Sequence, residues 1–379
     1  MPEKTVDLAI FIRSFHGGGA EKTMLSLIKN FIERGLRVDL LLPRAEGQYL
    51  EQLPSQVRLI DLKSQWIPAS LPKLISYLRR ERPQSLLAAL HYPSEIAILA
   101  KYLAQVKTKV VVIEQNTLSV EAKNSPQLSV RLNPLGAKIF YPWADKIVAV
   151  SQGVAQDLAQ TASLNLEKIK VIYNPGITPE VYQQGQAPVD HPWLQPGQPP
   201  VILGVGRLHP QKDFPTLIRA FGKVKQVRPA RLMILGTGPQ ESELKALINK
   251  LDLNNDVALA GFVQNPYAYL AKAAVFALSS IYEGLSVVLV EAMALGTPIV
   301  STDCPSGPSE ILDRGKYGLL TPVGDVEAMA QSILKALNSA TTKADSPWLE
   351  QFTIETCSQK YLEVLGFNPT SQIKQANLL

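Results

Sequence analysis

Residues 275–310 read VFALSSIYEGLSVVLVEAMALGTPIVSTDCPSGPSE, and this stretch decides the fold that the sequence predicts. Its first apolar run is typical of a buried strand in a parallel sheet. After a loop, an apolar helix is expected from Ser286, a candidate N-cap, to Leu295, with Gly296 just past its end. A second buried strand at 298–301 leads into a turn-rich loop. Strand, loop, helix and strand make one βαβ unit, which predicts an α/β fold.

Two carboxylates stand out in this unit. Glu283 follows the first strand, at the edge where open α/β sheets bind ligands. Glu291 lies eight residues further on, inside the otherwise apolar helix. Burying a carboxylate there costs free energy unless it accepts hydrogen bonds. Glu291 therefore pairs with a neighbouring Arg or Lys, faces solvent, or accepts hydrogen bonds from the hydroxyls of a bound sugar, and the residue types leave these interpretations open.

The whole string resembles the donor-site signature of the retaining family-four glycosyltransferases. Its parts are Glu283 and Glu291, the EGL before the helix, the run EAMALGTPIV, and the Gly-Pro-x-Glu turn. The resemblance implies the GT-B fold, an α/β class with two doubly wound, Rossmann-like domains facing each other across a cleft. It also implies that Glu283 orients the donor sugar and that Glu291 accepts the ribose hydroxyls. Backbone N–H groups at Gly284, Leu285 and Ser286 are expected to help bind the donor.

The composition is that of a globular protein of two domains. The chain has 379 residues with 46% apolar and 19% charged side chains, which rules against a disordered chain. Its 38 Lys and Arg against 33 Asp and Glu leave a formal charge of +5. This mild excess suits an anionic ligand or an anionic membrane surface. Nucleic acid is not an expected partner, because no basic run carries interleaved aromatic residues.

The two cysteines, Cys304 and Cys357, form no disulfide framework, so a reducing cytoplasm is the expected compartment. The first residues lack the apolar length and cleavage site of a signal peptide. No apolar stretch reaches the roughly 18 residues that a spanning helix needs. The protein is therefore expected to be cytoplasmic, with any membrane contact peripheral and at the cytoplasmic face.

Four segments are expected along the chain. An acceptor-side domain takes residues 1–177, and a linker rich in Pro, Gln and Gly follows at 178–200. A nucleotide-sugar-binding domain takes residues 201–350. In the resembled family a last helix crosses back to the first domain, which here corresponds to residues 351–379.

A glycine loop follows the first strand. Gly17, Gly18 and Gly19 stand between the strand at 7–12 and an amphipathic helix. Glycines let a backbone approach a ligand closely, and a helix N-terminus favours negative charge. A tight turn is the simpler explanation, although it accounts for one glycine more easily than for three. In the resembled family such a loop, with a glutamate such as Glu21, faces the donor diphosphate.

His91 follows the strand at 85–90 directly, and so lies at the same sheet edge as the glycine loop. We assign it to sugar contact and catalysis, with a capped loop residue as the alternative. Family members that act on lipid-linked sugars often carry a histidine at the position of Gln115, and Gln115 cannot titrate.

The segment at 71–82, LPKLISYLRRER, is a basic amphipathic helix. Such a helix can lie on an anionic bilayer. A helix that covers the sheet and turns a basic side to solvent is the commoner case, and we favour it.

The second half restarts with a strand at 201–206, followed closely by Arg207 and Lys212. Two cations at the carboxyl edge of a sheet suit a diphosphate, since Arg offers a planar fork and Lys a point charge. Alone they would be solvated loop charges, but the string G-R-L-x4-K-D resembles the diphosphate clamp of the family. By the same resemblance, Phe262 and Val263 are expected to line the base pocket.

These features predict a glycosyltransferase that moves a hexose or N-acetylhexosamine from a nucleotide-diphosphate sugar, with UDP preferred, to a glycan or polyprenyl-diphosphate-linked acceptor. The resemblance implies retention of configuration. No Asp-x-Asp pair is present for a metal, so no cofactor is expected. A sugar-nucleotide epimerase of the same fold and a non-catalytic nucleotide-sugar-binding protein are the alternatives. An NAD dehydrogenase is disfavoured, because no dinucleotide fingerprint follows a strand.

Overall fold

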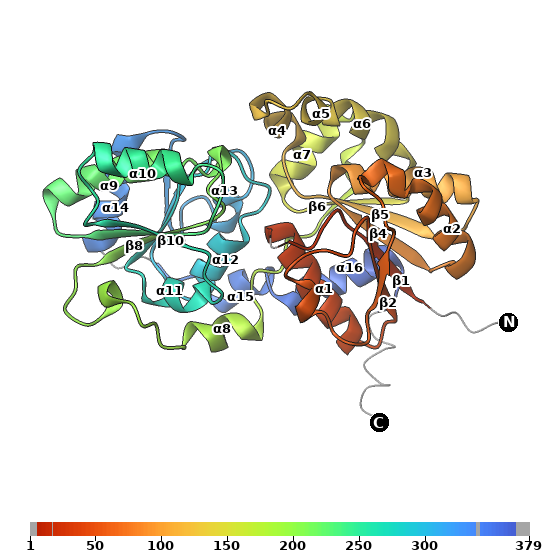
Figure 1. Cartoon of the computed structure of the whole chain (residues 1–379), viewed down its shortest axis with the longest axis horizontal. Helices are drawn as coiled ribbons and strands as arrows, with labels where there is room; N and C mark the ends of the chain where they lie inside the picture. Colours follow the sequence, from red (N-terminus) through yellow and green to blue (C-terminus); the bar gives the residue numbers. More distant parts are fainter. Residues whose placement is uncertain (1–5, 17, 339–341, 369–379) are drawn as a thin grey trace. The chain divides into compact units, whose positions relative to one another are not determined.

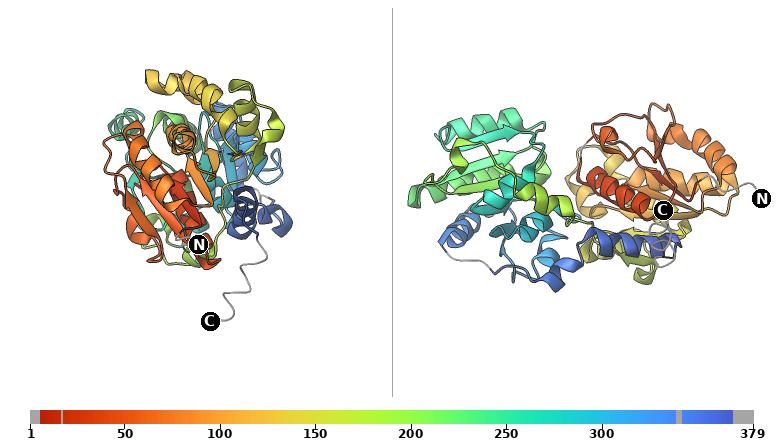
Figure 2. Two further views of the ribbon diagram at one scale, coloured as in Figure 1. Left: turned by 90° about the vertical axis from the view of Figure 1, so that its right-hand side faces the viewer. Right: turned by 90° about the horizontal axis from the view of Figure 1, so that it is seen from below.

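The chain folds as two compact α/β units. The computed structural model describes residues 6–16, 18–338 and 342–368. The first unit combines residues 1–175 with 351–379, and the second comprises residues 176–350. In the described part of each unit, every pair of neighbouring strands is parallel, and helices cover both faces of the sheet (Figure 1, Figure 2). The predicted fold class, two doubly wound Rossmann-like domains, is confirmed.

The sheet of the first unit has the strand order β3-β2-β1-β4-β5-β6-β7 within the described residues. Its strands are β1 (Leu8–Phe11), β2 (Val38–Leu42), β3 (Arg58–Asp61), β4 (Ser85–Ala89), β5 (Lys109–Glu114), β6 (Lys146–Ala149) and β7 (Ile169–Val171). Its α-helices are α1 (Gly19–Glu33), α2 (Leu71–Glu81), α3 (His91–Ala104), α4 (Leu118–Asn124), α5 (Leu128–Arg131), α6 (Asn133–Phe140), α7 (Gln152–Thr161) and α16 (Ile354–Leu365). Its 3₁₀ helices are η1 (Leu50–Gln52), η2 (Ile67–Ser70), η3 (Tyr141–Trp143) and η4 (Leu166–Lys168).

The sheet of the second unit has the order β10-β9-β8-β11-β12-β13 over the part of the chain that is described. Its strands are β8 (Val201–Val205), β9 (Arg231–Leu235), β10 (Val257–Gly261), β11 (Val275–Leu278), β12 (Ile299–Thr302) and β13 (Leu319–Thr321). Its helices are α8 (Pro179–Gly185), η5 (Pro192–Leu194), η6 (Pro210–Lys212), α9 (Phe214–Val227), α10 (Glu241–Lys250), α11 (Pro266–Lys272), α12 (Val287–Ala294), α13 (Pro308–Ile311), α14 (Val326–Asn338) and α15 (Ser346–Glu350).

Apolar burial explains these elements. All residues of β1 and of β11 are buried, as parallel strands covered on both faces require. Helix α9 turns Leu217, Phe221 and Val224 inward at helical spacing, and all three are inaccessible to solvent. Each such side chain contributes roughly 1.5–3 kcal/mol relative to an exposed one. These side chains anchor α9 in the core of the second unit.

The deciding stretch forms the predicted βαβ unit with small shifts. Helix α12 begins at Val287 and ends at Ala294, and β12 begins one residue later than expected. Ser286 is the N-cap as predicted, but its side chain accepts no capping hydrogen bond. Gly296 has a positive φ of 74°, which suits the residue that follows a helix end.

The segment at 178–200 is not a bare linker. It contains α8 and η5, and it belongs to the second unit, whose boundary falls after Pro175. Gly176 lies so close to α12 that a Cβ there would meet the side chain of Val290 at 2.7 Å. Figure 1 shows α8 beside α11, with which it is in contact. The prolines mislead because two of them begin helices, where proline fits well.

Helix α16 follows the second unit in sequence but packs in the first. Thr353 caps it by accepting a hydrogen bond from the backbone N–H of Thr356 at 3.3 Å. Ser85 at the start of β4 donates to the carbonyl of Leu365 at 2.6 Å. The helix lies beside α1 (Figure 1). These contacts tie residues 351–368 to the first unit.

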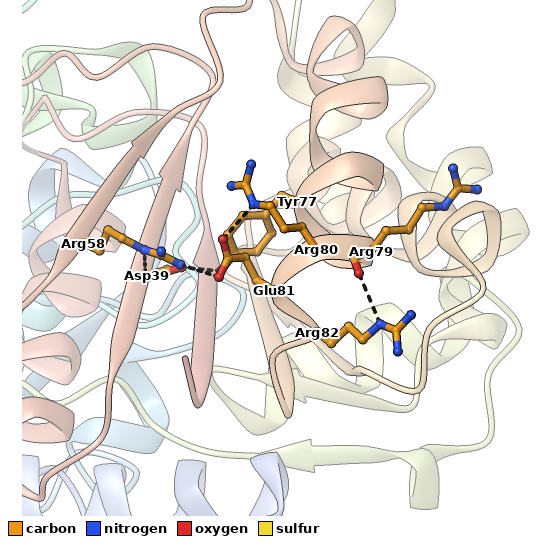
Figure 3. Close-up of polar contacts among 7 residues, drawn as sticks. All are labelled: Asp39, Arg58, Tyr77, Arg79, Arg80, Glu81 and Arg82. Carbon is orange, nitrogen blue, oxygen red and sulfur yellow. Dashed lines mark hydrogen bonds and ion pairs between the residues drawn. The ribbon is translucent and has the colours of Figure 1, made fainter. Parts of the chain in front are cut away.

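The basic helix α2 covers the sheet, as the favoured interpretation expected. Leu74 and Leu78 are inaccessible to solvent, and the helix packs on α3. Figure 3 shows that Tyr77 and Glu81 of this helix face Asp39 and Arg58, whereas Arg79 and Arg82 point away from them. Tyr77 donates to the buried Asp39 at 2.6 Å, and Arg58 pairs with the same carboxylate at 2.5 Å. Because Leu74 and Leu78 are buried, the apolar face of α2 is not free for a bilayer.

Candidate active site

The predicted donor residues gather at one edge of the second sheet. Strands β8 and β11 are neighbours, but β8 leads on to β9 on one side while β11 leads on to β12 on the other. Such a reversal leaves a crevice at the carboxyl ends of the two strands, where α/β sheets bind ligands. The loop after β8 carries Arg207 and Lys212, and the loop after β11 carries Glu283. The fold thus brings residues 71 positions apart to one place.

Lys212 and Glu283 form an ion pair across this crevice. Nζ of Lys212 lies 2.5 Å from Oε1 of Glu283, and Oγ of Ser280 donates to the same oxygen at 2.6 Å. The two side chains are 17% and 7% exposed. Within the described residues, Oε2 of Glu283 accepts no hydrogen bond. A lysine has three N–H donors, so Lys212 can hold Glu283 and still donate to a ligand.

Short polar contacts lock the two loops together. Ser279 donates through Oγ to the backbone carbonyl of Lys212 at 2.7 Å. The backbone N–H of Ile281 donates to Gln211 at 2.8 Å, and the Gln211 amide donates to Tyr282 at 3.0 Å. The sequence analysis assigned no role to the serine pair at 279–280. A polar pair directly after a buried strand is the signal that could have shown it.

Arg207 is the exposed cation of the site. Its guanidinium makes no ion pair or hydrogen bond with the residues that the structure describes. The pKa of the neighbouring His209 is lowered, first by burial and then by the positive charge of Arg207. His209 accepts a hydrogen bond from the backbone N–H of Gln211 at 3.3 Å through Nδ1. Arg207, exposed and without a partner among the described residues, can therefore bind an anion.

The N-terminus of α12 presents buried donors without partners. The backbone N–H groups of Gly284, Leu285 and Ser286 donate no hydrogen bond within the described residues. All three residues are buried, and Oγ of Ser286 also lacks a partner. Buried N–H groups left unpaired are rare and costly, so each one calls for an explanation. The positive end of a helix and four unpaired polar groups together can bind an anion.

The remaining donor-side predictions lie around this centre. Glu291 is buried on α12 and is only 3% exposed. Phe262 and Val263 follow β10, the edge strand, and Phe262 is 60% exposed. The structure thus leaves the Phe262 ring unpacked, as a ligand-contacting residue would be, while the roles assigned to these three residues stay predictions.

In the first unit, β1 and β4 are the neighbouring strands at which the strand order reverses. The glycine loop follows β1, and His91 follows β4, so both reach the same sheet edge as predicted. Gly18 is the N-cap of α1, and Glu21 lies in its first turn. A Cβ at Gly18 would meet the Glu21 carboxylate at 2.3 Å, whereas Gly19 has open space around its Cα. Gly17 lies outside the described residues.

His91 points into a buried polar network. Its Nε2 lies 3.1 Å from Glu95, one helical turn along α3. Its Nδ1 lies 3.5 Å from the hydroxyl of Tyr141, and this hydroxyl donates to Glu114 at 2.9 Å. Burial raises the pKa of Glu114 to about 7, although the nearby His91 and the Tyr141 hydroxyl act in the opposite direction. The sequence analysis named His91 but not Glu95, Glu114 and Tyr141, which form the network with it.

Two amides lie at the same edge. Asn174 donates to Oε1 of Gln115 at 2.8 Å, while Nε2 of Gln115 and Oδ1 of Asn174 have no partner among the described residues. Gln115 holds the position where the resembled family often has a histidine. The structure therefore gives this position a hydrogen-bonding role that does not depend on proton transfer.

Comparison with known proteins gives a consistent result. The family model described as Glycosyltransferase Family 4 matches residues 17–177, and that described as Glycosyl transferases group 1 matches residues 189–346. N-acetylgalactosamine-N,N'-diacetylbacillosaminyl-diphospho-undecaprenol 4-alpha-N-acetylgalactosaminyltransferase of Campylobacter jejuni is 31% identical over 375 residues, which cover 94% of this chain and 99% of that protein. Lipopolysaccharide core biosynthesis glycosyltransferase LpsE of Rhizobium meliloti is 27% identical, over 93% of this chain and 97% of its own.

Solved structures resemble the fold over its whole length. HepE of Anabaena in complex with UDP has a TM-score of 0.75 at 22% identity, covering 95% of this chain and 99% of that one. The lipopolysaccharide outer core galactosyltransferase WaaB has a TM-score of 0.70 at 18% identity, covering 95% of this chain and 99% of its own.

Proposed function

The chain belongs to glycosyltransferase family four and carries its group 1 domain. From this premise we propose that it transfers a hexose or N-acetylhexosamine from a UDP-sugar to a lipid-linked or glycan acceptor. The configuration of the sugar is retained. One observation carries the donor part of this proposal. The unpaired N–H groups at the start of α12 stand beside the Lys212–Glu283 pair at a strand-order reversal. A diphosphate joined to a sugar would satisfy both features.

Each predicted donor-site residue of the second unit has a separate role in this proposal. Arg207 and Lys212 stabilise the negative charge that grows on the departing diphosphate. Glu283 accepts a hydrogen bond from a hydroxyl of the donor sugar through Oε2, which has no partner in the described residues. Glu291 accepts the ribose hydroxyls, and Phe262 and Val263 contact the base. UDP is favoured because the similar HepE structure holds UDP.

The reaction balances without a covalent enzyme intermediate. The bond between the anomeric carbon and the diphosphate oxygen breaks, and both electrons leave on the diphosphate. The acceptor oxygen bonds to the anomeric carbon on the same face, which retains the configuration. The acceptor proton passes to the departing phosphate oxygen. The two cations carry the charge, so this mechanism needs no metal ion.

The acceptor is assigned by analogy with the relatives. The Campylobacter relative is named for an undecaprenyl-diphosphate-linked acceptor, and the Rhizobium relative for lipopolysaccharide core biosynthesis. We propose that this chain acts in the same kind of biosynthesis, the assembly of a cell-surface polysaccharide or of an oligosaccharide on a polyprenyl diphosphate. We assign His91, Gly18 and Gly19 of the first unit to ligand contact as well.

The site of action follows from the acceptor. Both cysteines are free and buried, as a reducing compartment allows. Across the described residues, no helix is long and apolar enough to cross a bilayer. We propose that the chain works at the cytoplasmic face of a membrane and contacts that membrane peripherally.

The test combines donor and acceptor in one assay. The protein is incubated with UDP-glucose, UDP-galactose, UDP-N-acetylglucosamine or UDP-N-acetylgalactosamine and a polyprenyl-diphosphate-linked sugar, with and without EDTA. We expect UDP release and an α-linked product, as shown by proton NMR, at the same rate in EDTA. A β-linked product would overturn retention, and activity that returns only with manganese would overturn the metal-free mechanism. An epimerised UDP-sugar formed without acceptor would point to the epimerase alternative.

A further inference from the structure

The first unit exposes a continuous apolar stripe on α5, α6 and η3. Its members are Leu128, Leu132, Leu135, Ile139 and Trp143, which we call the apolar stripe. Each is between 52% and 69% exposed, although all are large apolar side chains. They make up five of the fifteen exposed large apolar residues in the described chain, within sixteen positions of sequence. This concentration separates them from the scattered surface residues that every protein has.

The stripe lies on one face of a nearly continuous helix. Its members are spaced by four, three, four and four residues, which is the repeat of one helix face. Backbone hydrogen bonds bridge α5 and α6, from Leu132 to Leu128 at 3.1 Å and from Gly136 to Leu132 at 3.2 Å. Figure 1 shows α4, α5 and α6 in olive as an outer layer, in which α4 and α6 contact α7, and α6 also contacts α3.

The opposite face of this helix is fixed to the unit. Asn133 and Ala137 are buried beneath it, and the next residue of the inner face is the buried Tyr141. A Cβ at Gly136 would overlap the Glu95 carboxylate, and would meet Nε2 of His91 at 3.2 Å. The helix therefore has no room to roll its apolar side inward. The stripe stays at the surface because the polar network of His91 occupies the space below.

Charge around the stripe is positive and unbalanced. Residues 122–144 contain Lys123, Arg131 and Lys138 and no Asp or Glu. All three basic side chains are exposed, and none makes an ion pair within the described residues. Of the two acidic residues that border this stretch, Asp145 is paired with Lys101 at 2.5 Å, and Glu121 also takes part in an interaction. An apolar face with a basic border complements an anionic bilayer, into which such a helix sinks by roughly 5–10 Å.

An aromatic pair lies at one end of the stripe. The rings of Trp143 and Tyr102 meet edge to face with centroids 5.4 Å apart, and each residue is about half exposed. The Tyr102 hydroxyl donates to the backbone carbonyl of Trp143 at 3.1 Å. Rings of this kind, apolar with a polar end, collect at the level of lipid headgroups.

We infer that the apolar stripe and its basic border are a docking surface for an anionic lipid bilayer. This inference gives the membrane-facing role to α5 and α6 and not to α2, because the apolar side of α2 is buried and that of α5 and α6 is open. It deepens the proposed function in one respect, since a chain that lies on a bilayer meets a lipid-linked acceptor there. Its test, however, needs no acceptor and no turnover.

The experiment measures co-sedimentation of the full chain with vesicles of about 30 mol% phosphatidylglycerol in phosphatidylcholine, against pure phosphatidylcholine. We expect binding to the anionic vesicles only. The triple variant Leu132→Gln, Leu135→Gln, Ile139→Gln should lose at least about tenfold in partitioning, since three aliphatic side chains no longer enter the bilayer. Brominated lipid should quench Trp143 fluorescence in the wild type, and the variant Trp143→Phe should lose that quenching.

Two controls separate this inference from other outcomes. Val227→Gln changes an equally exposed apolar residue in the second unit, and Arg80→Gln changes an exposed arginine of α2. Both should bind vesicles as the wild type does. The triple variant should keep its affinity for UDP, so a loss of UDP binding would point to misfolding and a lack of UDP binding in the wild type would count against the proposed function alone. Wild-type protein that ignores anionic vesicles, or a stripe that instead holds two copies together in solution, would overturn the inference.

Discussion

The two sheets reverse their strand order at equivalent places, yet the edges built there differ in kind. In the second unit, the edge beside β8 and β11 leaves polar groups open, among them Arg207 and the donors at Ser286. In the first unit, the edge beside β1 and β4 turns His91 inward to Glu114 and Tyr141. One edge leaves a cation and hydrogen-bond donors open, whereas the other holds most of its titratable groups in contact with one another. The same fold thus supports one edge with open charged groups and another, here called the self-satisfied edge, whose titratable groups pair with one another while the amides of Gln115 and Asn174 keep unpartnered atoms.

The largest expected effect comes from a substitution at Lys212, on the edge of the second unit. Replacement by alanine leaves the Glu283 carboxylate, which is 7% exposed, without its ion pair. Breaking a largely buried pair costs several kcal/mol, and a missing cation also weakens diphosphate binding. We expect Lys212→Ala to lose about 100-fold or more in turnover and at least about tenfold in UDP affinity. Initial rates and titration calorimetry with UDP measure the two effects.

A matched control is Lys245→Ala, which removes an exposed lysine that pairs with Glu241 on α10. Surface pairs of this kind contribute little, so this variant should behave as the wild type. Variants of the first unit such as His91→Asn should leave UDP affinity within about twofold if the donor depends on the second unit. Unchanged UDP binding in Lys212→Ala would remove the diphosphate role of this residue.

The donor edge could be predicted from sequence because its residues lie in short strings. Arg207 and Lys212 directly follow a buried strand, and Glu283 follows another, so strand ends alone place them. What the sequence could not show is that Lys212 pairs with Glu283, since this requires knowing that β8 and β11 are neighbours. Contacts between adjacent parallel strands join positions far apart in the chain.

The first unit resisted prediction for the same reason, to a greater degree. The network of His91 joins the ends of β4 and β5 to a tyrosine that follows α6. Nothing local to Glu114 or Tyr141 indicates this meeting. The apolar stripe is visible in sequence as a helical repeat, but periodicity does not tell whether that face meets the core or solvent. The direction of that face is decided at Gly136, because Glu95 and His91 come so close that no side chain fits there.

The self-satisfied edge can be tested through pH. Burial raises the pKa of Glu114 from 4.5 to about 7, so between these values the folded chain keeps a proton that the unfolded chain has lost. Stability therefore falls as pH rises through this window, by at most about 3 kcal/mol. In Glu114→Gln this fall should be much smaller, and at pH 8 the variant should be the more stable protein. Urea unfolding at pH 5, 6, 7 and 8 measures the difference.

An exposed glutamate provides the control for this experiment. Glu51 on η1 is exposed, so Glu51→Gln should follow the wild-type profile. Parallel profiles for the wild type and Glu114→Gln would show that the Glu114 carboxylate titrates normally. The first edge would then be polar and open, like the second, and the contrast between them would lose its main support.

The smallest expected effect comes from Ser286, and it sharpens the contrast most directly. Its buried Oγ has no partner among the described residues, so Ser286→Ala should leave the free protein as stable or up to about 1 kcal/mol more stable. The same change should weaken UDP-sugar binding by about fivefold, because the ligand loses a hydrogen bond worth about 1 kcal/mol. Thr117 on the first unit also has an unpartnered hydroxyl, so Thr117→Val is the matched control and should leave donor affinity unchanged. Opposite signs for stability and affinity at Ser286 would show that this edge keeps its polar groups unpaired for a ligand, whereas a loss of stability with unchanged affinity would make Ser286 an ordinary structural residue.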